Sequence, residues 1–160
     1  MTARRLRLAR VPKLGEISNF LGHMRYSTRL SALRAVVDGP FVAWTLKKRG
    51  VRPLLTTAAS GSPRMDPVQA KHVATALDAG LALIPIAPTC LRRSVTLARE
   101  LKRLDLAGTL HIGVRTVSDR VEAHAWIQVG DVVVNDDPAL TGTYLQLAAG
   151  ELDNLLPLLK

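Results

Sequence analysis

The chain has 160 residues, of which 48% are hydrophobic, and its 22 Lys and Arg against 13 Asp and Glu give a formal charge of +9. This composition is typical of one globular domain and excludes an intrinsically disordered chain. Cys90 is the sole cysteine, which excludes an intrachain disulfide, and nothing argues for an oxidising compartment.

No segment of the sequence is suited to cross a membrane. A bilayer span requires about 20 consecutive apolar residues. The best apolar run, 79–87, is much shorter and already contains Pro85. The basic residues at the start of the chain are not followed by the apolar segment that a signal peptide requires. We therefore expect a cytoplasmic protein without a transmembrane segment.

Charge is unevenly distributed along the chain. Residues 1–64 carry 13 basic and 2 acidic side chains, a net charge of +11, whereas residues 65–160 carry 9 basic and 11 acidic ones, a net charge of −2. This asymmetry predicts an acidic partner for the front section, such as nucleic acid, anionic lipid or an acidic peptide. The basic residues lack interleaved aromatic ones, which argues against specific nucleic-acid binding.

The basic front section, residues 1–60, is predicted to be helical. Ser27 can cap a helix with an apolar spacing of three to four, and Gly39-Pro40 is expected to end it. A second helix follows, with Gly50 as its C-terminal stop. The front section is therefore expected to consist of short packing helices.

The second section, residues 61–160, opens with two helices behind a turn-rich loop. Asp66-Pro67 is a good helix start, and its packing positions are predicted at Val68, His72, Leu77 and Leu81. Thr89 can cap the next helix, which places Cys90 in the first turn. That helix has one apolar face and ends by Gly108.

Behind Gly108 the hydrophobic period changes from about 3.6 to about 2. The segments 110–115 and 121–129 alternate apolar and polar residues, which predicts two half-buried antiparallel strands. Gly130-Asp131 is predicted as a hairpin turn into a third strand, 132–136, and the leucine-rich tail, 143–156, as a helix. The sequence thus predicts an α+β fold in which the helix bearing Cys90 packs on a small antiparallel sheet.

Cys90 and His124 have the placement that nucleophilic catalysis needs. Unpaired amides and the dipole at a helix start favour a thiolate, although a lone cysteine also serves as a small buried apolar residue. His124 lies on the strand face opposite the one expected to pack on the core, so we expect it to be presented to a reactant. The next strand ends in acids that could orient the imidazole: a strict two-residue turn pairs His124 with Asp137, whereas a longer loop or a bulge pairs it with Asp136.

The chain has a cysteine at a helix start, then a histidine on one strand, then an aspartate on the next strand. This is the order found in papain-like and transglutaminase-like cysteine enzymes. The other histidines have no cysteine or acid neighbours at metal spacing, so no metal site is expected. A glycine-rich phosphate loop is also missing from the sequence, and no cofactor is expected.

Three segments carry a family resemblance: Thr-Cys-Leu-Arg-Arg-Ser at 89–94, His-Ala-Trp-Ile at 124–127 and Val-Asn-Asp at 134–136. Over roughly residues 66–137, the chain resembles the transglutaminase-like cysteine peptidases of lasso-peptide biosynthesis. These B proteins remove the leader from a ribosomally made precursor peptide. The resemblance implies a papain/transglutaminase-like core and a cysteine peptidase activity.

The resemblance also implies roles for individual residues. Cys90 corresponds to the nucleophile, His124 to the base and Asp136 to the acid that orients the imidazole. Arg93 matches the arginine three residues after the nucleophile, and Trp126 either walls the substrate site or packs in the core. The chain departs from the family at Gln128, where an acid is usual.

The implied partners are the precursor leader peptide, a stand-alone winged-helix leader-binding protein and an ATP-dependent macrolactam synthetase. The chain resembles the compact, split form of the peptidase, without a fused leader-recognition domain. Two alternatives stay open. The same residues could serve a transglutaminase-like acyltransferase that resolves the thioester with an amine, or the front section could make the chain a non-enzymatic basic binding protein.

Overall fold

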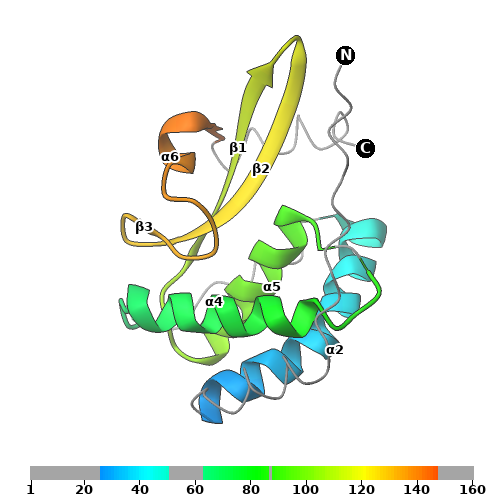
Figure 1. The fold of residues 1–160 in the computed structure, drawn as a ribbon, viewed down its shortest axis with the longest axis vertical. Helices are drawn as coiled ribbons and strands as arrows, with labels where there is room; N and C mark the ends of the chain where they lie inside the picture. Colours follow the sequence, from blue (N-terminus) through cyan, green and yellow to red (C-terminus); the bar gives the residue numbers. More distant parts are fainter. Residues whose placement is uncertain (1–25, 51–62, 87, 148–160) are drawn as a thin grey trace.

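The computed structural model describes residues 26–50, 63–86 and 88–147. The described elements are α2 (Tyr26–Arg49), α4 (Pro67–Leu81), α5 (Cys90–Arg103), β1 (Thr109–Val117), β2 (Arg120–Val129), β3 (Val132–Val133), α6 (Leu140–Thr143) and β4 (Leu145–Gln146). The helices α2, α4 and α5 lie together against one end of the long β1–β2 hairpin, whose tip extends beyond them (Figure 1). The sheet is antiparallel, with the strand order β3-β2-β1-β4. This arrangement confirms the predicted α+β class.

α2 is one helix where the sequence predicted two. It begins at Tyr26, before the predicted cap Ser27, and continues through Gly39 and Pro40. A proline inside a helix costs about 3 kcal/mol, but burial of Ala35 and Val42 on either side of it compensates. Tertiary packing thus overrides the local signal to stop.

The C-terminal end of α2 is as predicted. Gly50 has a φ of +72°, and its N–H donates to the carbonyl of Leu46 at 3.2 Å. Only glycine adopts this left-handed conformation without strain. Ala35 of α2 belongs to the same buried cluster as residues of α4 and α5, so α2 shares their hydrophobic core. The predicted boundary between the two sections, at residues 60 and 61, lies outside the described residues.

α4 starts where the sequence predicted. The Asp66 side chain accepts a hydrogen bond from the N–H of Gln69 at 2.8 Å, and a proline occupies the first turn. The predicted packing positions Val68 and His72 are wrong, because both side chains are exposed. The buried face consists instead of Ala70, Val73, Ala74, Ala76, Leu77, Gly80 and Leu81. Small residues are needed on this face because α2 approaches closely: a Cβ on Gly80 would lie 2.1 Å from the carbonyl oxygen of Ala32.

α5 is the central helix of the molecule. It contacts α2, α4 and the sheet strands β1 and β2, and it buries polar side chains as well as apolar ones. The buried residues of α5 are Arg92, Ser94, Val95, Thr96, Leu97, Glu100 and Leu101. Two of the polar members fix the helix against its neighbours, because Ser94 bonds to Ala125 of β2 and Glu100 accepts a hydrogen bond from Ser31 of α2.

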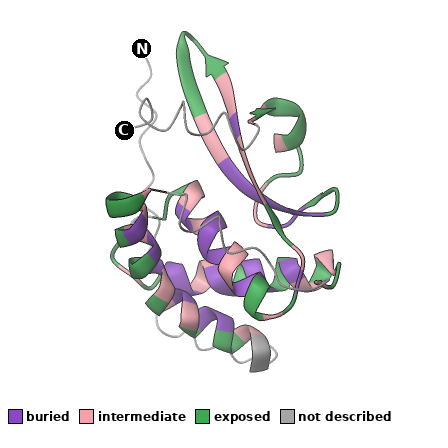
Figure 2. Cartoon of the chain, turned by 180° about the vertical axis from the view of Figure 1, so that it is seen from behind, coloured by how far each residue is buried: buried purple, intermediate pink, exposed green. Residues whose placement is uncertain are grey.

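β1 and β2 confirm the two predicted strands and are joined by a two-residue turn. Ser118 and Asp119 have φ values of 46° and 65°, the backbone that such a hairpin turn requires. The hairpin tip is exposed, while the half of β2 next to the helices is buried (Figure 2). From 125 to 129 every residue of β2 is buried, so both faces of this end are covered.

β3 is shorter than predicted. Val129 pairs with Val132, which confirms the two-residue turn at Gly130-Asp131, but the strand ends at Val133 instead of Asp136. The side chain of Asn135 explains the early end, because its Oδ1 accepts the hydrogen bond of Ile127 N–H at 2.8 Å. A side chain thus takes the position that the backbone of a continuing strand would occupy.

The segment behind β3 also departs from the prediction. The predicted tail helix, 143–156, is wrong over its described part, which holds the last residue of α6 and then β4. The remainder of that prediction lies outside the described residues. None of the helices that the structure describes is long and apolar enough to span a bilayer.

Candidate active site

Cys90 is the first residue of α5, and Thr89 caps that helix start. The Thr89 side chain accepts a hydrogen bond from the N–H of Arg92 at 3.3 Å, and the Thr89 carbonyl accepts one from the N–H of Arg93 at 3.0 Å. Within the described part of the chain, no acceptor pairs with the N–H of Cys90 itself. The residue is partly buried. The sulfur therefore lies at the positive end of the helix dipole, beside an unpaired amide donor.

His124 on β2 contacts Asp136 behind β3. The Nε2 of His124 lies 2.9 Å from the Oδ2 of Asp136, and both side chains are partly buried. The other carboxylate oxygen of Asp136 accepts the N–H of Asp137 at 2.9 Å. Both oxygens are thus engaged, which fixes the carboxylate against the imidazole ring.

The contact with Asp136 occurs even though the strict two-residue turn is present. Such a turn pairs His124 with Asp137 by register alone, but the ladder ends before it reaches these residues. The chain leaves the sheet at Asn135 and turns the Asp136 side chain toward His124. Asp137 instead caps the following turn, where its Oδ1 accepts the N–H of Ala139 at 2.9 Å.

The contact to Asp136 leaves one ring nitrogen of His124, Nδ1, for another partner. Among the described residues no hydrogen bond joins His124 to Cys90. In enzymes without substrate, hydrogen bonds between catalytic groups are often long and tighten in the complex. The structure brings His124 and Asp136 into contact. It places Cys90 at the start of α5, which packs against the strand of His124, but no described hydrogen bond joins Cys90 to His124.

Arg93 connects α5 to α4 and to the segment that carries Asp136. Its Nε and Nη2 donate to the two oxygens of Asp78 at 2.8 and 2.6 Å, and Nη2 also donates to the carbonyl of Asn135 at 3.1 Å. The pKa of Arg93 is raised, first by the hydrogen bond to Asp78 and further by electrostatic interaction with Asp78, Asp136 and Cys90, while burial opposes the rise. Cys90 and Asp136 therefore share one cationic neighbour.

Ser94 and Asn135 form a second connection, which sequence reasoning missed. Ser94 Oγ donates to the carbonyl of Ala125 on β2 at 2.9 Å, and Asn135 Nδ2 donates to Ser94 Oγ at 2.9 Å. Ser94 is fully buried. Both residues lie inside the segments 89–94 and 134–136, and a serine on the buried face of a helix was the available signal. The pair fixes the helix start and the Asp136 segment to the same strand.

Aromatic side chains lie around His124. The rings of His111 and His124 each stack with that of Trp126, at centroid distances of 5.8 and 6.4 Å, and the Tyr144 ring lies 5.4 Å from that of His124. Trp126 is 0% exposed, so its ring is packed in the protein interior. That Trp126 walls the substrate site stays a prediction. The stacking of its ring with the imidazole of His124 is observed. Tyr144 could not be found from the sequence, because its segment was assigned to a helix.

A glycine opposite His124 makes room for this cluster. Gly113 pairs with His124 across the two strands. A Cβ at Gly113 would lie 2.8 Å from the Cβ of Tyr144 and 2.9 Å from the Trp126 ring, closer than non-bonded carbon atoms approach. Gly113 is therefore required for both aromatic side chains to contact His124.

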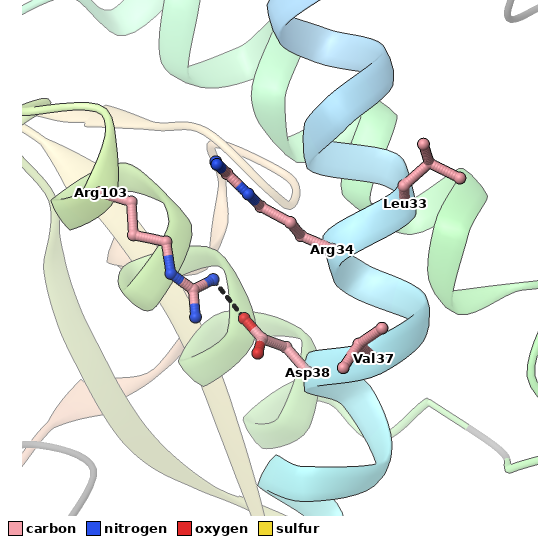
Figure 3. Close-up of a pocket in the computed structure, with 5 residues that line it drawn as sticks. All are labelled: Leu33, Arg34, Val37, Asp38 and Arg103. Atoms are coloured by element: carbon pink, nitrogen blue, oxygen red, sulfur yellow. Dashed lines mark hydrogen bonds and ion pairs between the residues drawn. The ribbon is translucent and has the colours of Figure 1, made fainter.

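A separate pocket of about 410 Å³ lies between α2 and α5, away from these residues. Figure 3 shows its lining side chains, with Arg103 directed at Asp38. They are Leu33, Arg34, Val37, Asp38 and Arg103. None of them is a cysteine, serine or histidine, so this pocket offers no nucleophile. Metal-binding clusters of three or more His, Cys, Asp or Glu are not found in the part of the chain that the structure describes.

The chain belongs to the transglutaminase-like superfamily, whose family model matches residues 33–149. The match begins within α2 and includes α4, α5 and the whole sheet, so it covers most of the described fold. Members of this superfamily are usually cysteine-protease-like or acyltransferase-like enzymes. Comparisons with curated proteins and with solved structures gave no match.

Proposed function

We propose that the chain is a cysteine peptidase that cleaves the leader from a ribosomally made precursor peptide during lasso-peptide maturation. The observation that carries the proposal is the 2.9 Å contact between His124 and Asp136, next to a helix whose first residue is the sole cysteine. Membership of the transglutaminase-like superfamily supports the acyl-transfer chemistry. The three segments at 89–94, 124–127 and 134–136 support the peptidase class.

The reaction proceeds through a thioester. Cys90 gives its proton to His124, and the thiolate attacks the carbonyl carbon of the residue at the leader–core junction. The imidazolium then protonates the departing amine, and the tetrahedral intermediate collapses to the thioester. Water attacks the thioester while His124 takes its proton. The acid product leaves, and the proton returns to the thiol.

The residues around this pair have supporting roles in the proposal. Asp136 holds the imidazole with Nε2 toward itself and Nδ1 toward the nucleophile. The N–H of Cys90 at the helix start, which pairs with no described acceptor, is the proposed donor to the developing oxyanion. Arg93 and Asn135 hold the two halves of the site together.

The partners follow from the peptidase class. The substrate is the precursor peptide, and its leader is held by a stand-alone winged-helix protein. An ATP-dependent macrolactam synthetase acts on the product, so nucleotide belongs to that partner and not to this chain. We place the reaction in the cytoplasm.

The test is mass spectrometry of a panel of lasso precursor peptides incubated with this protein and a leader-binding partner. Wild type is compared with Cys90→Ala and with Asp137→Ala, a variant that removes a neighbouring carboxylate with no contact to His124. The proposal expects loss of the leader with wild type and Asp137→Ala, and none with Cys90→Ala.

Other outcomes distinguish the alternatives. If a primary amine is incorporated at the junction in place of water, the chain is an acyltransferase. If Cys90→Ala cleaves as well as wild type, the nucleophile is assigned wrongly. If no precursor is processed and the protein instead binds DNA with a steep salt dependence that Cys90→Ala leaves unchanged, the basic front section is the functional part.

A further inference from the structure

The outer edge of β2 is paired over only part of its length. β3 pairs with Gln128 and Val129, and the bond from Val134 N–H to Ile127 O extends this pairing by one residue. β2 itself continues to Arg120. No described strand lies beside its other half on this side.

Alternate residues of β2 direct their backbone groups out of this edge. The two-residue turn makes Val117 and Arg120 a hydrogen-bonded pair, so even-numbered residues of β2 bond to β1. The odd-numbered residues therefore point outward. The bonds of Ala125 and Ile127 agree, because their carbonyls accept from Ser94 Oγ and Val134 N–H respectively.

Two residues continue this outward series without a partner. Val121 and Ala123 follow the same alternation, and among the described residues nothing accepts from their outward N–H groups or donates to their carbonyls. Val121 is 63% exposed. The hairpin projects beyond the described helices at this point (Figure 1), so no element that the structure describes covers this edge.

The unpaired part of the β2 edge lies on the side of the molecule where α5 starts with Cys90. Leu101 of α5 lies near Ile127, since a Cβ on Gly108 would contact both side chains. Ser94, two turns earlier, bonds to Ala125. α5 therefore runs along β2 with its start toward the lower residue numbers, and Cys90, one further turn earlier, lies toward Ala123. The open backbone groups and the nucleophile belong to the same end of the molecule.

We propose that an extended peptide substrate adds as a strand to the outer edge of β2 at Val121 and Ala123. The peptide runs antiparallel to β2, in the direction of β3, and its carbonyls and N–H groups pair with the outward groups of these two residues. This inference rests on the proposed function and specifies its substrate: an unfolded, extended peptide, held by its backbone, whose scissile carbonyl is delivered to Cys90.

The opposite edge of the hairpin provides an internal control. Thr116 pairs with Val121 across the two strands, and its backbone groups point outward from β1. β4 pairs only with Gly113 and Val114 on that side. Val121 and Thr116 thus present equivalent groups on opposite edges, and only the edge at Val121 belongs to the strand along which α5 and Cys90 run.

The test is amide hydrogen exchange of the full-length Cys90→Ala protein with peptides that span the leader–core junction of the precursor panel. A peptide bound to about 90% of the protein slows the exchange of a newly bonded amide about tenfold. We expect this slowing at Val121 and Ala123, with the Thr116 amide unchanged. In parallel, Val121→Pro removes the outward donor and is expected to reduce cleavage about tenfold, whereas Thr116→Pro leaves it within about twofold.

The outcomes distinguish a failure of the edge proposal from a failure of the peptidase proposal. If wild type cleaves a peptide that does not slow exchange at Val121 and Ala123, the edge proposal is wrong and the peptidase stands. Slowing at both amides without cleavage by wild type supports the edge and contradicts the peptidase. With neither slowing nor cleavage across the panel, both proposals are wrong.

Discussion

The two ends of α5 are both fixed by buried polar side chains, but they are fixed to different parts of the molecule. Near its start, Ser94 bonds to β2 and to Asn135, and Arg93 bonds to Asp78 and to Asn135. Near its end, Glu100 bonds to Ser31 and Arg34 of α2.

The first set of contacts joins the three segments that carry Cys90, His124 and Asp136. The second set joins two helices and involves no residue of the candidate site. Buried polar contacts of similar chemistry should therefore have different consequences when they are broken, with activity lost at the start of α5 and stability lost at its end.

The largest effect is expected at the acid. Asp136→Ala removes the carboxylate that holds His124, and we expect cleavage to fall roughly 100-fold or more because the imidazole loses its orientation. Asp137→Ala removes only a turn cap and should stay within about threefold of wild type. The measurement is kcat/KM for both variants. Equal losses would show that the contact at His124 has no special role.

Glu100→Ala tests the other end of α5. Glu100 is 1% exposed, and its carboxylate bonds to Ser31, Arg34 and Arg103. Removing the carboxylate breaks the hydrogen bond from the buried Ser31 hydroxyl and the two ion pairs with the part-exposed Arg34 and Arg103, which should lower the free energy of unfolding by about 2 kcal/mol. Urea denaturation measures this loss. Cleavage per folded molecule should be unchanged, and a large loss of activity in the folded fraction would contradict the separation of the two ends.

Gly113→Ala tests the space around the base. The added methyl group would overlap Tyr144 and Trp126, and we expect a loss of about 2 kcal/mol in stability together with reduced cleavage. Gly142→Ala is the matched control, because nothing lies within 4 Å of a Cβ at that position. Thermal unfolding and cleavage should both leave Gly142→Ala close to wild type. A neutral Gly113→Ala would mean that the aromatic cluster adapts freely.

Asn135→Ala should have the smallest effect on stability and still reduce activity. The substitution removes the bonds from Asn135 Nδ2 to Ser94 and from Ile127 N–H to Asn135 Oδ1, at a cost of about 1 kcal/mol. Because the segment bearing Asp136 then keeps only backbone attachments, such as the bond from Arg93 to the carbonyl of residue 135, we expect about a tenfold loss in kcat with little change in KM. A variant with full kcat would assign Asn135 a purely structural role.

Much of the secondary structure could be predicted because its signals are local. Asp66 and Thr89 cap their helices through their own side chains, Gly50 supplies a left-handed backbone, and the alternation at 110–115 and 121–129 marks the two long strands. Each signal is contained within a few neighbouring residues.

The features that could not be predicted depend on contacts distant in sequence. α2 continues through Pro40 because residues on both sides of it are buried against other helices. Trp126 is fully buried, and the ring of Tyr144, which is distant in sequence, lies 6.3 Å from its ring.

The candidate site shows the same division. Cys90 could be placed from the local helix start, and His124 from strand alternation. The choice between Asp136 and Asp137 could not be made from register, because the Asn135 side chain ends the ladder before the register reaches either acid. The family resemblance pointed to Asp136, and the contact with His124 involves that residue.

Alkylation of Cys90 tests most directly whether the cysteine and the histidine act together. Cys90 is the sole cysteine, so the rate of reaction with iodoacetamide at neutral pH reports on this thiol alone and requires no substrate. We predict that wild type reacts faster than the urea-unfolded chain, and that His124→Ala slows the folded protein by about tenfold. A folded wild type that reacts no faster than the unfolded chain, at a rate unaffected by His124→Ala, would contradict the assignment of Cys90 and His124 as nucleophile and base.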